Sequence, residues 1–152
     1  MRIVADTSGI VAAVVSAEPT HAECRRVLED ATEVFISPCV ATETCYLLRA
    51  GGHDRAVAGF LANLAQGFYE IVPLAAGDCA PVAALMETYR DALRRKRPKP
   101  GTIDLADAHN VVIADRRHTT SLLTLDQDYR FVRPLSGMPF FTLLPEDLGP
   151  ER

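Results

Sequence analysis

The sequence predicts an α/β fold, with a central parallel sheet of about five strands and helices on both of its faces. Short segments rich in Val, Ile and Leu alternate along the chain with amphipathic segments long enough to form helices. None of the apolar segments is followed by the turn signal of a hairpin. Parallel strands are joined by crossover connections, usually helical, so this pattern favours a three-layer α/β/α domain.

The first third of the chain is expected to contribute two strands and three helices. The apolar residues 2–5 end at the polar turn 6–9, where Ser8 or Gly9 is a suitable helix cap. Pro38 closes the second strand, and Gly51-Gly52 stops the helix that follows it. The expected elements are a strand at 2–5, helices over 10–15 and 20–30, a strand at 34–37 and a helix over 40–50.

The rest of the chain continues the alternation. Asp78 is a candidate cap for a long helix to about Arg95, and the segment 98–101 breaks the chain. No linker divides the sequence, so residues 1–146 are expected to form one domain, and 147–152 a frayed tail. The remaining expected elements are helices over 55–66, 78–95 and 104–116 and strands at 69–72, 121–125 and 140–143.

Composition points to an ordinary globular protein. The 152 residues are 48% hydrophobic and carry a formal net charge of −4, which does not indicate a nucleic-acid binder but leaves one possible if a metal neutralises acids locally. No apolar run reaches the roughly 20 residues of a membrane span. The four cysteines form no metal-binding spacing, so we expect free thiols and a cytoplasmic protein. They are Cys24, Cys39, Cys45 and Cys79.

Four acidic residues stand at the ends of predicted core elements. Asp6 and Asp126 follow predicted strands, whereas Glu43 and Asp107 lie near the starts of predicted helices. The carboxyl ends of parallel strands meet at one edge of the sheet, so all four side chains can reach a common site. Asp104 lies three residues before Asp107, on the same helical face.

Clustered carboxylates without a cation would destabilise the fold, so a shared metal ion is expected. Oxygen ligands with no His or Cys nearby favour Mg²⁺ or Mn²⁺, and such a site suits phosphodiester hydrolysis. Each acid also has a simpler interpretation. Asp6, Asp104 and Asp107 could cap helices, Glu43 could lie on a solvated face, and Asp128 could be a turn residue. Only their combination favours a site.

The motifs that carry these acids resemble the PIN domain family, and within it the VapC-type toxin ribonucleases of toxin–antitoxin pairs. The matching segments, in order, are Ile3-Val4-Ala5-Asp6-Thr7-Ser8, Ser37-Pro38 with Thr42-Glu43, Asp104-Leu105-Ala106-Asp107-Ala108 and Leu123-Thr124-Leu125-Asp126-Gln127-Asp128-Tyr129. Their order and spacing cover almost the whole chain. One departure is Tyr129, where the family often has Phe.

The resemblance implies a function and a set of site residues. The family's acidic quartet falls on Asp6, Glu43, Asp107 and Asp126, with Asp104 and Asp128 as auxiliary acids for a second ion. Thr7 and Thr124 match the family's small hydroxyl residues that orient carboxylates. The protein would be an Mg²⁺- or Mn²⁺-dependent endoribonuclease, a homodimer, and the target of a VapB-like antitoxin that lies across the acidic groove.

Two other functions remain open. A PIN-like module that binds RNA or protein without catalysis would have the same fold, although this chain retains all four acids. A haloacid dehalogenase-type phosphatase also begins with an Asp after its first strand. That chemistry needs a second Asp two residues later, where this chain has Ser8, and a lysine on a later strand, where only Lys96 and Lys99 are available.

The basic run at 94–99 either holds an RNA backbone or simply ends a helix with cations that suit its dipole. The four histidines show no spacing typical of a zinc site or catalytic pair, and we expect them to be surface residues or hydrogen-bonded ones. They are His21, His53, His109 and His118.

Overall fold

The computed structural model describes residues 1–90 and 103–149. Its centre is a sheet of five parallel strands in the order β3-β2-β1-β4-β5, so β1 occupies the middle. Strands β2 and β3 follow on one side of β1, and β4 and β5 follow on the other. The strand order therefore reverses between β1 and β4. The strands are β1 (Arg2–Ala5), β2 (Glu33–Ile36), β3 (Glu70–Ile71), β4 (Ser121–Leu123) and β5 (Thr142–Leu144).

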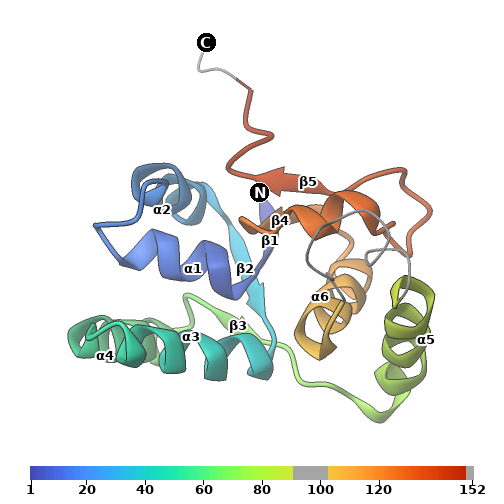
Figure 1. Ribbon diagram of the computed structural model, residues 1–152, viewed down its shortest axis with the longest axis horizontal. Helices are drawn as coiled ribbons and strands as arrows, with labels where there is room; N and C mark the ends of the chain where they lie inside the picture. The colour runs from blue at the N-terminus through green and yellow to red at the C-terminus, as the bar shows by residue number, and fades with distance from the viewer. Residues whose placement is uncertain (91–102, 150–152) are drawn as a thin grey trace.

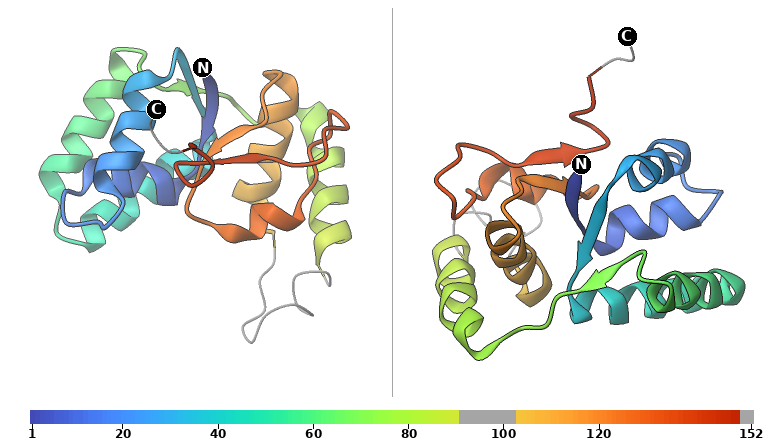
Figure 2. Two further views of the ribbon diagram at one scale, coloured as in Figure 1. Left: turned by 90° about the horizontal axis from the view of Figure 1, so that it is seen from above. Right: turned by 180° about the vertical axis from the view of Figure 1, so that it is seen from behind.

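Helices cover both faces of this sheet, as Figures 1 and 2 show. The helices α1 to α4 lie on one side, and α5 and α6 lie on the other. The three-layer α/β/α arrangement predicted from the sequence is confirmed. The helices are α1 (Thr7–Val14), α2 (His21–Asp30), α3 (Pro38–Ala50), α4 (Asp54–Ala65), α5 (Cys79–Tyr89) and α6 (Leu105–Arg116), with 3₁₀ helices η1 (Ala76–Asp78) and η2 (Gln127–Phe131).

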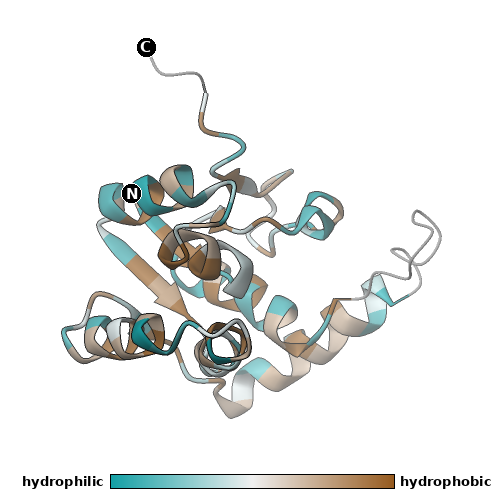
Figure 3. Ribbon diagram, turned by 60° about the vertical axis from the view of Figure 1, so that its left-hand side comes forward, coloured by the Kyte–Doolittle hydropathy of each residue, from teal (hydrophilic) through white to brown (hydrophobic). Residues whose placement is uncertain are grey.

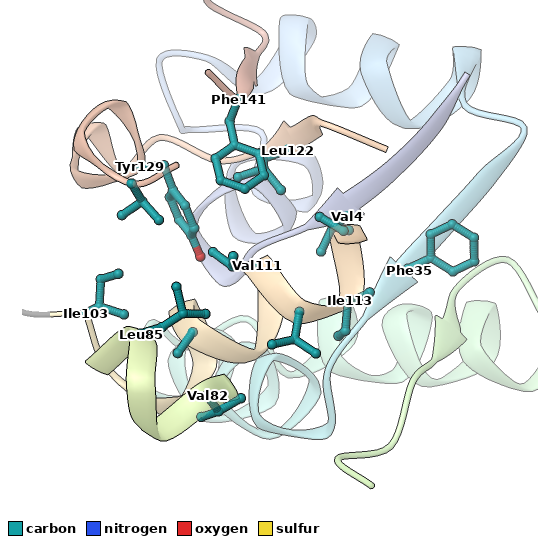
Figure 4. Close-up of a cluster of buried hydrophobic side chains, with 14 of the residues drawn as sticks. Val4, Phe35, Val82, Leu85, Ile103, Val111, Ile113, Leu122, Tyr129 and Phe141 are labelled. Carbon is teal, nitrogen blue, oxygen red and sulfur yellow. The ribbon is translucent and has the colours of Figure 1, made fainter. Parts of the chain in front are cut away.

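Alternate strand residues belong to two separate cores. Val4, Phe35 and Leu122 pack with residues of α5 and α6 in the cluster of Figure 4. Their neighbours Ile36 and Leu123 face the opposite way and pack against the α1–α4 layer. This alternation follows from the two-residue period of a strand. Hydrophobic residues accordingly follow the strands in Figure 3, whereas the helices mix hydrophobic and hydrophilic positions.

Helix α6 is buried on nearly all sides because it lies between the sheet and α5 (Figure 1). Every residue from 108 to 114 is buried, including His109 and Asn110. The expectation that His109 is a surface or hydrogen-bonded histidine is therefore wrong. It is fully buried, and neither ring nitrogen has a hydrogen-bond partner among the described residues. Burial lowers its pKa, so it is neutral at pH 7.

Several element boundaries differ from the sequence expectations for local reasons. Helix α1 begins at Thr7 rather than near residue 10, with Asp6 in the capping position. Pro38 is the first residue of α3, where a missing N–H is tolerated, and Ser37 caps that helix by accepting from the Val40 amide. Strand β4 ends at Leu123, so Thr124 and Leu125 separate it from Asp126.

Asp78 does not cap α5, contrary to the prediction. Its Oδ2 atom accepts from the Ala75 amide and forms a 2.7 Å ion pair with Arg116 of α6. Asp78 is 8% exposed, whereas the Arg116 side chain is 44% exposed, so this pair ties α6 to the segment that precedes α5 through a buried acid and a half-exposed cation. A buried acid needs such a partner, which is why it turns toward Arg116.

Some expectations concern residues outside the described ranges. These are the helix beyond residue 90, the break at 98–101, the basic run at 94–99 and the end of the tail from residue 150. Asp147, the first residue of the expected tail, accepts two 2.7 Å bonds from Arg130 and one from the Leu143 amide. The described cysteines are free thiols. None of the described helices has the length and apolar character to span a bilayer.

Candidate active site

An open pocket of about 320 Å³ lies beyond the carboxyl ends of β1 and β4. All four acids that the sequence singled out line it, although they come from four distant segments of the chain. A larger and more apolar hollow of about 670 Å³ adjoins it and shares Glu43, Asp104 and Ala106. The pocket residues are Asp6, Thr7, Ser8, Glu43, Leu47, Asp104, Ala106, Asp107 and Asp126.

Asp6 is held by hydroxyl groups. Its Oδ2 atom accepts from Ser8 Oγ at 2.9 Å and from Thr124 Oγ1 at 3.0 Å, and its backbone amide donates to the Leu123 carbonyl at 2.9 Å. Burial raises the pKa of Asp6, while the bonds from Ser8 and Thr124 lower it and the charge of Asp126 raises it again. The neutral hydroxyls of Ser8 and Thr124 thus offset part of the free-energy cost of burying the Asp6 carboxylate, which has no ion-pair partner among the described residues.

The close approach of α1 to β4 depends on Gly9. A Cβ atom at this position would lie 2.6 Å from both the Cγ atom and the carbonyl oxygen of Leu123. Real Cβ atoms do not approach backbone that closely, so a side chain here would push the start of α1 away from β4. Gly9 therefore allows Asp6 and Thr124 to meet.

Glu43 lies on the exposed surface of α3, in its second turn. Thr7 Oγ1 donates a 2.7 Å hydrogen bond to Glu43 Oε2, joining the start of α1 to α3. The Thr7 side chain is buried, so the hydroxyl is fixed relative to the sheet. The two threonines matched to orienting roles each donate to a carboxylate of the quartet, Thr7 to Glu43 and Thr124 to Asp6.

Asp104 and Asp107 cap the helix that they begin. Asp104 Oδ1 accepts from the Asp107 amide at 3.0 Å, and Asp107 Oδ2 accepts from the Asp104 amide at 3.1 Å, forming a reciprocal capping box. Both residues also line the pocket. Burial raises the pKa of Asp107 to about 7, and the charges of Asp104 and Asp6 contribute to that rise.

Asp126 occupies the capping position of η2 and lines the pocket. Its Oδ1 atom accepts from the Asp128 amide at 2.8 Å, and its own amide donates to Thr124 Oγ1 at 3.0 Å. Asp128 does not line the main pocket but a smaller one that also contains Asp107, Asp126 and Tyr129.

Comparison with known proteins identifies the family. The PIN domain model matches residues 3–133. Over 145 residues the chain is 32% identical to ribonuclease VapC26 from Mycobacterium tuberculosis, a match that covers 94% of this chain and 100% of that protein. The chain belongs to the PIN domain family.

A solved structure shows the same PIN fold. It is the crystal structure of VapC20 from Mycobacterium tuberculosis, described as a toxin that cleaves the sarcin–ricin loop. The match has a TM-score of 0.61 at 20% sequence identity and covers 83% of this chain and 91% of that one. At this identity the likeness concerns the fold.

PIN domain ribonucleases use divalent metal ions, and the donors of this pocket suit one. The pocket is lined by carboxylates and hydroxyls, which are the oxygen donors that hard cations prefer, and it has no His or Cys in its lining. Burial raises the pKa values of Asp6 and Asp107, and the neighbouring acids add to the rise, so a bound cation would favour their charged forms. Within 1–90 and 103–149, however, no three potential ligand side chains converge closely enough to hold one ion in their present conformations.

Sequence reasoning missed three residues of this PIN domain site. Ser8 is a candidate helix cap within the first PIN motif, but the sequence does not indicate the bond that its hydroxyl donates to Asp6. Asn110 was not considered, although it lies one helical turn after Asp107 and therefore on the same face. Tyr129 was noted only as a departure from Phe, yet its hydroxyl donates to Asp107 at 3.0 Å and accepts from Asn110 at 3.1 Å.

Proposed function

We propose that this chain is a metal-dependent endoribonuclease, the toxin of a toxin–antitoxin pair, which hydrolyses RNA in the cytoplasm. The observation that carries the proposal is the gathering of Asp6, Glu43, Asp107 and Asp126 around one pocket where strand order reverses. PIN domain membership and the extended similarity to a protein named as a ribonuclease support the same chemistry.

The four acids are the proposed ligands of Mg²⁺ or Mn²⁺. Asp104 is a further candidate because it lines the same pocket, and Asp128 is a weaker one because it lines only the smaller pocket beside it. A divalent ion bound here would supply Lewis-acid activation of the phosphodiester and of the attacking water. Glu43 Oε1 and Asp126 Oδ2 accept no hydrogen bond from the described residues, so both remain available to a ligand.

Side-chain hydroxyls of the chain hold the pocket acids in place. Thr7 fixes Glu43, while Ser8 and Thr124 fix Asp6, so these hydroxyls are already committed as donors. The pocket also lacks a His or Cys that could form a nucleophile–base pair. Hydrolysis by water, without a covalent enzyme intermediate, is therefore the reaction that suits these side chains.

We further propose that the protein acts as a homodimer and is inhibited by a VapB-like antitoxin, as expected for a toxin of this kind. The alternative is a module that binds RNA or protein without cleaving it. This alternative predicts that RNA or protein binds equally well when the pocket acids can no longer hold a metal ion.

Cleavage of RNA in Mg²⁺ or Mn²⁺ tests the proposal. Asp6→Asn is expected to lower the rate by at least about 100-fold, because it removes a charge from the metal site while keeping side-chain volume. Asp54→Asn is the matched control, since Asp54 is an exposed acid at the start of α4 that pairs with Arg49 of α3. Sequencing of RNA ends after expression would then identify the target.

The result that contradicts the proposal is equal behaviour of wild type and Asp6→Asn. If both proteins leave RNA intact in either metal, and wild type binds neither ion, the chain is not a metal-dependent nuclease. Binding of RNA with unchanged affinity by both proteins would then favour the non-catalytic alternative.

A further inference from the structure

Two buried neutral side chains connect the carboxylates of Asp6 and Asp107. Asn110 Nδ2 lies 3.4 Å from Asp6 Oδ1 and 3.1 Å from the Tyr129 hydroxyl, and that hydroxyl lies 3.0 Å from Asp107 Oδ1. The four residues come from the end of β1, from α6 and from η2. They form one continuous hydrogen-bonded chain, which we call the Asn110–Tyr129 bridge.

The chemistry of these groups fixes the direction of every bond. An amide nitrogen carries two hydrogens, so Asn110 can donate one to Asp6 and the other to Tyr129. The single hydroxyl hydrogen of Tyr129 is then free to go to Asp107. The opposite orientation of the amide would place its oxygen against the Asp6 carboxylate. Asp6 therefore receives a hydrogen from Asn110, and Asp107 receives one from Tyr129.

The bridge has little freedom to move. Tyr129 is 2% exposed and Asn110 is 1% exposed. The Tyr129 ring packs edge-on to Phe141 at a centroid distance of 6.3 Å, and its hydroxyl end reaches to α6 near Val111 (Figure 4). Because packing holds the ring, the position of the hydroxyl is set by the core rather than by solvent.

Asp107 is held at both oxygens as a result. Oδ1 accepts from Tyr129, and Oδ2 accepts from the Asp104 amide in the capping box. A carboxylate offers about four acceptor sites, so these two bonds leave about two for another ligand. The bonds thus limit rotation of the carboxylate without filling it.

We propose that Tyr129 is a positioning residue: through its hydroxyl and Asn110 it sets the relative placement of the Asp6 and Asp107 carboxylates, and thereby the affinity of the pocket for a divalent cation. This inference rests on the proposed function, because it assumes that these two acids bind the metal. The donors of the bridge are uncharged, so they orient the two acids without neutralising the negative charge that attracts the cation.

The direct test is Tyr129→Phe, which deletes one oxygen atom and keeps the packed ring. Calorimetric titration with Mn²⁺ is expected to show affinity lowered by about 10- to 100-fold, the usual effect of removing a group that orients a metal ligand. In RNA cleavage, kcat at fixed subsaturating Mn²⁺ should fall while the KM for RNA changes little, and higher Mn²⁺ should restore part of kcat.

Tyr69→Phe is the matched control. Tyr69 is 3% exposed and packs against Phe60 and Phe68 in the other core, away from the pocket. Both variants remove a hydroxyl from a buried ring, so both test the effect of core perturbation. Only Tyr129→Phe is expected to change Mn²⁺ affinity.

Asn110→Leu provides a second variant, because it removes both donated bonds from α6. It should also weaken Mn²⁺ binding, since Asp6 loses a donor and Tyr129 loses the group that orients its hydroxyl toward Asp107. If the two residues act as one unit, the double variant should lose less Mn²⁺ affinity than the two single losses combined predict. Fully additive losses would contradict a shared bridge.

The inference is overturned if Tyr129→Phe binds Mn²⁺ with wild-type affinity and retains wild-type kcat, even if its melting temperature falls. That outcome leaves the proposed function intact as long as wild type binds Mn²⁺ and cleaves RNA. If wild type does neither, the proposed function itself fails, so the two failures are distinct.

Discussion

Thr7 and Glu43 are joined by a 2.7 Å hydrogen bond between a buried hydroxyl on α1 and an exposed carboxylate on α3. The bond spans two helices that begin after adjacent strands, β1 and β2. Because Thr7 is fixed relative to the edge of the sheet, the bond also fixes the Glu43 carboxylate, which would otherwise be mobile in solvent.

Thr7→Val should reduce RNA cleavage by about 10- to 100-fold, because it keeps the side-chain shape and removes the donor that orients Glu43. Thr7→Ser retains the hydroxyl and should keep most of the activity. Steady-state rates of the two variants on one RNA substrate provide the measurement. Equal loss in both variants would mean that packing of the Thr7 methyl group, and not its hydroxyl, matters.

Gly9→Ala is expected to destabilise the protein although alanine favours helices. Alanine normally stabilises a helix interior by about 1 kcal/mol relative to glycine. At Gly9 the added Cβ would meet Leu123 at 2.6 Å, which outweighs that gain. Gly59 on α4 has no atom within 4 Å of such a Cβ, so Gly59→Ala should stabilise by about that amount.

Urea unfolding of the two glycine variants distinguishes these effects. A stabilised Gly9→Ala variant would contradict the close approach of α1 and β4. Activity adds a second measurement, since the clash displaces Asp6 from Thr124 whereas Gly59 lies in the helix layer away from the pocket residues.

The metal-free protein should carry a pH-dependent penalty from Asp107. Its pKa is about 7 in the fold and near 3.8 in a free chain, so between these values the folded state binds more protons than the unfolded state. Its contribution to the unfolding free energy therefore decreases as pH rises from about 4 to about 7. Asp107→Asn removes this slope and should gain about 1–3 kcal/mol at pH 7.5 relative to wild type.

Wild type and Asp107→Asn are compared because other groups make the unfolding free energy change with pH in the opposite direction. His109 has a lowered pKa, and Asp147 has a pKa lowered by Arg130, so both contribute stability that is lost on acidification. Thermal melts of wild type and Asp107→Asn in chelator from pH 4.5 to 7.5 give the difference. Parallel curves would show that Asp107 titrates normally.

His109→Leu should stabilise the protein. Both ring nitrogens are buried without a partner among the described residues, so an apolar side chain of similar size avoids about 1–3 kcal/mol of desolvation. The gain should widen below pH 6.5, where the unfolded chain takes up a proton that the buried ring resists. His53→Leu, at an exposed position, is the control and should show no such widening in thermal melts.

The sequence predicted the fold and the acids because both follow from local patterns. Asp6 could be placed at the sheet edge because a buried strand precedes it, and Asp107 because it lies in the first turn of a recognisable helix. The partners of these acids depend on tertiary packing instead. Tyr129 meets Asn110 only because η2 folds back over α6, and no spacing in the sequence encodes that contact.

His109 and Asp104 show the same limit in other ways. Helix geometry predicts that His109 points away from the acid face of α6, but the sequence does not reveal that α6 is packed against α5 and that His109 is buried. Asp104 had two interpretations, a helix cap or an auxiliary acid. The structure shows that it caps α6 while also lining the pocket, so the two are compatible.

The pocket stands at the boundary between two cores that the sheet otherwise keeps apart. Asp6 and Glu43 belong to the α1–α3 side, whereas Asp107 is anchored to η2 and the α5–α6 side. A ligand that engages acids from both sides must oppose the separate opening of either side. Backbone amides of α1 and of α6 should then exchange with deuterium more slowly together, although most buried hydrophobic residues of the two helices lie in different cores.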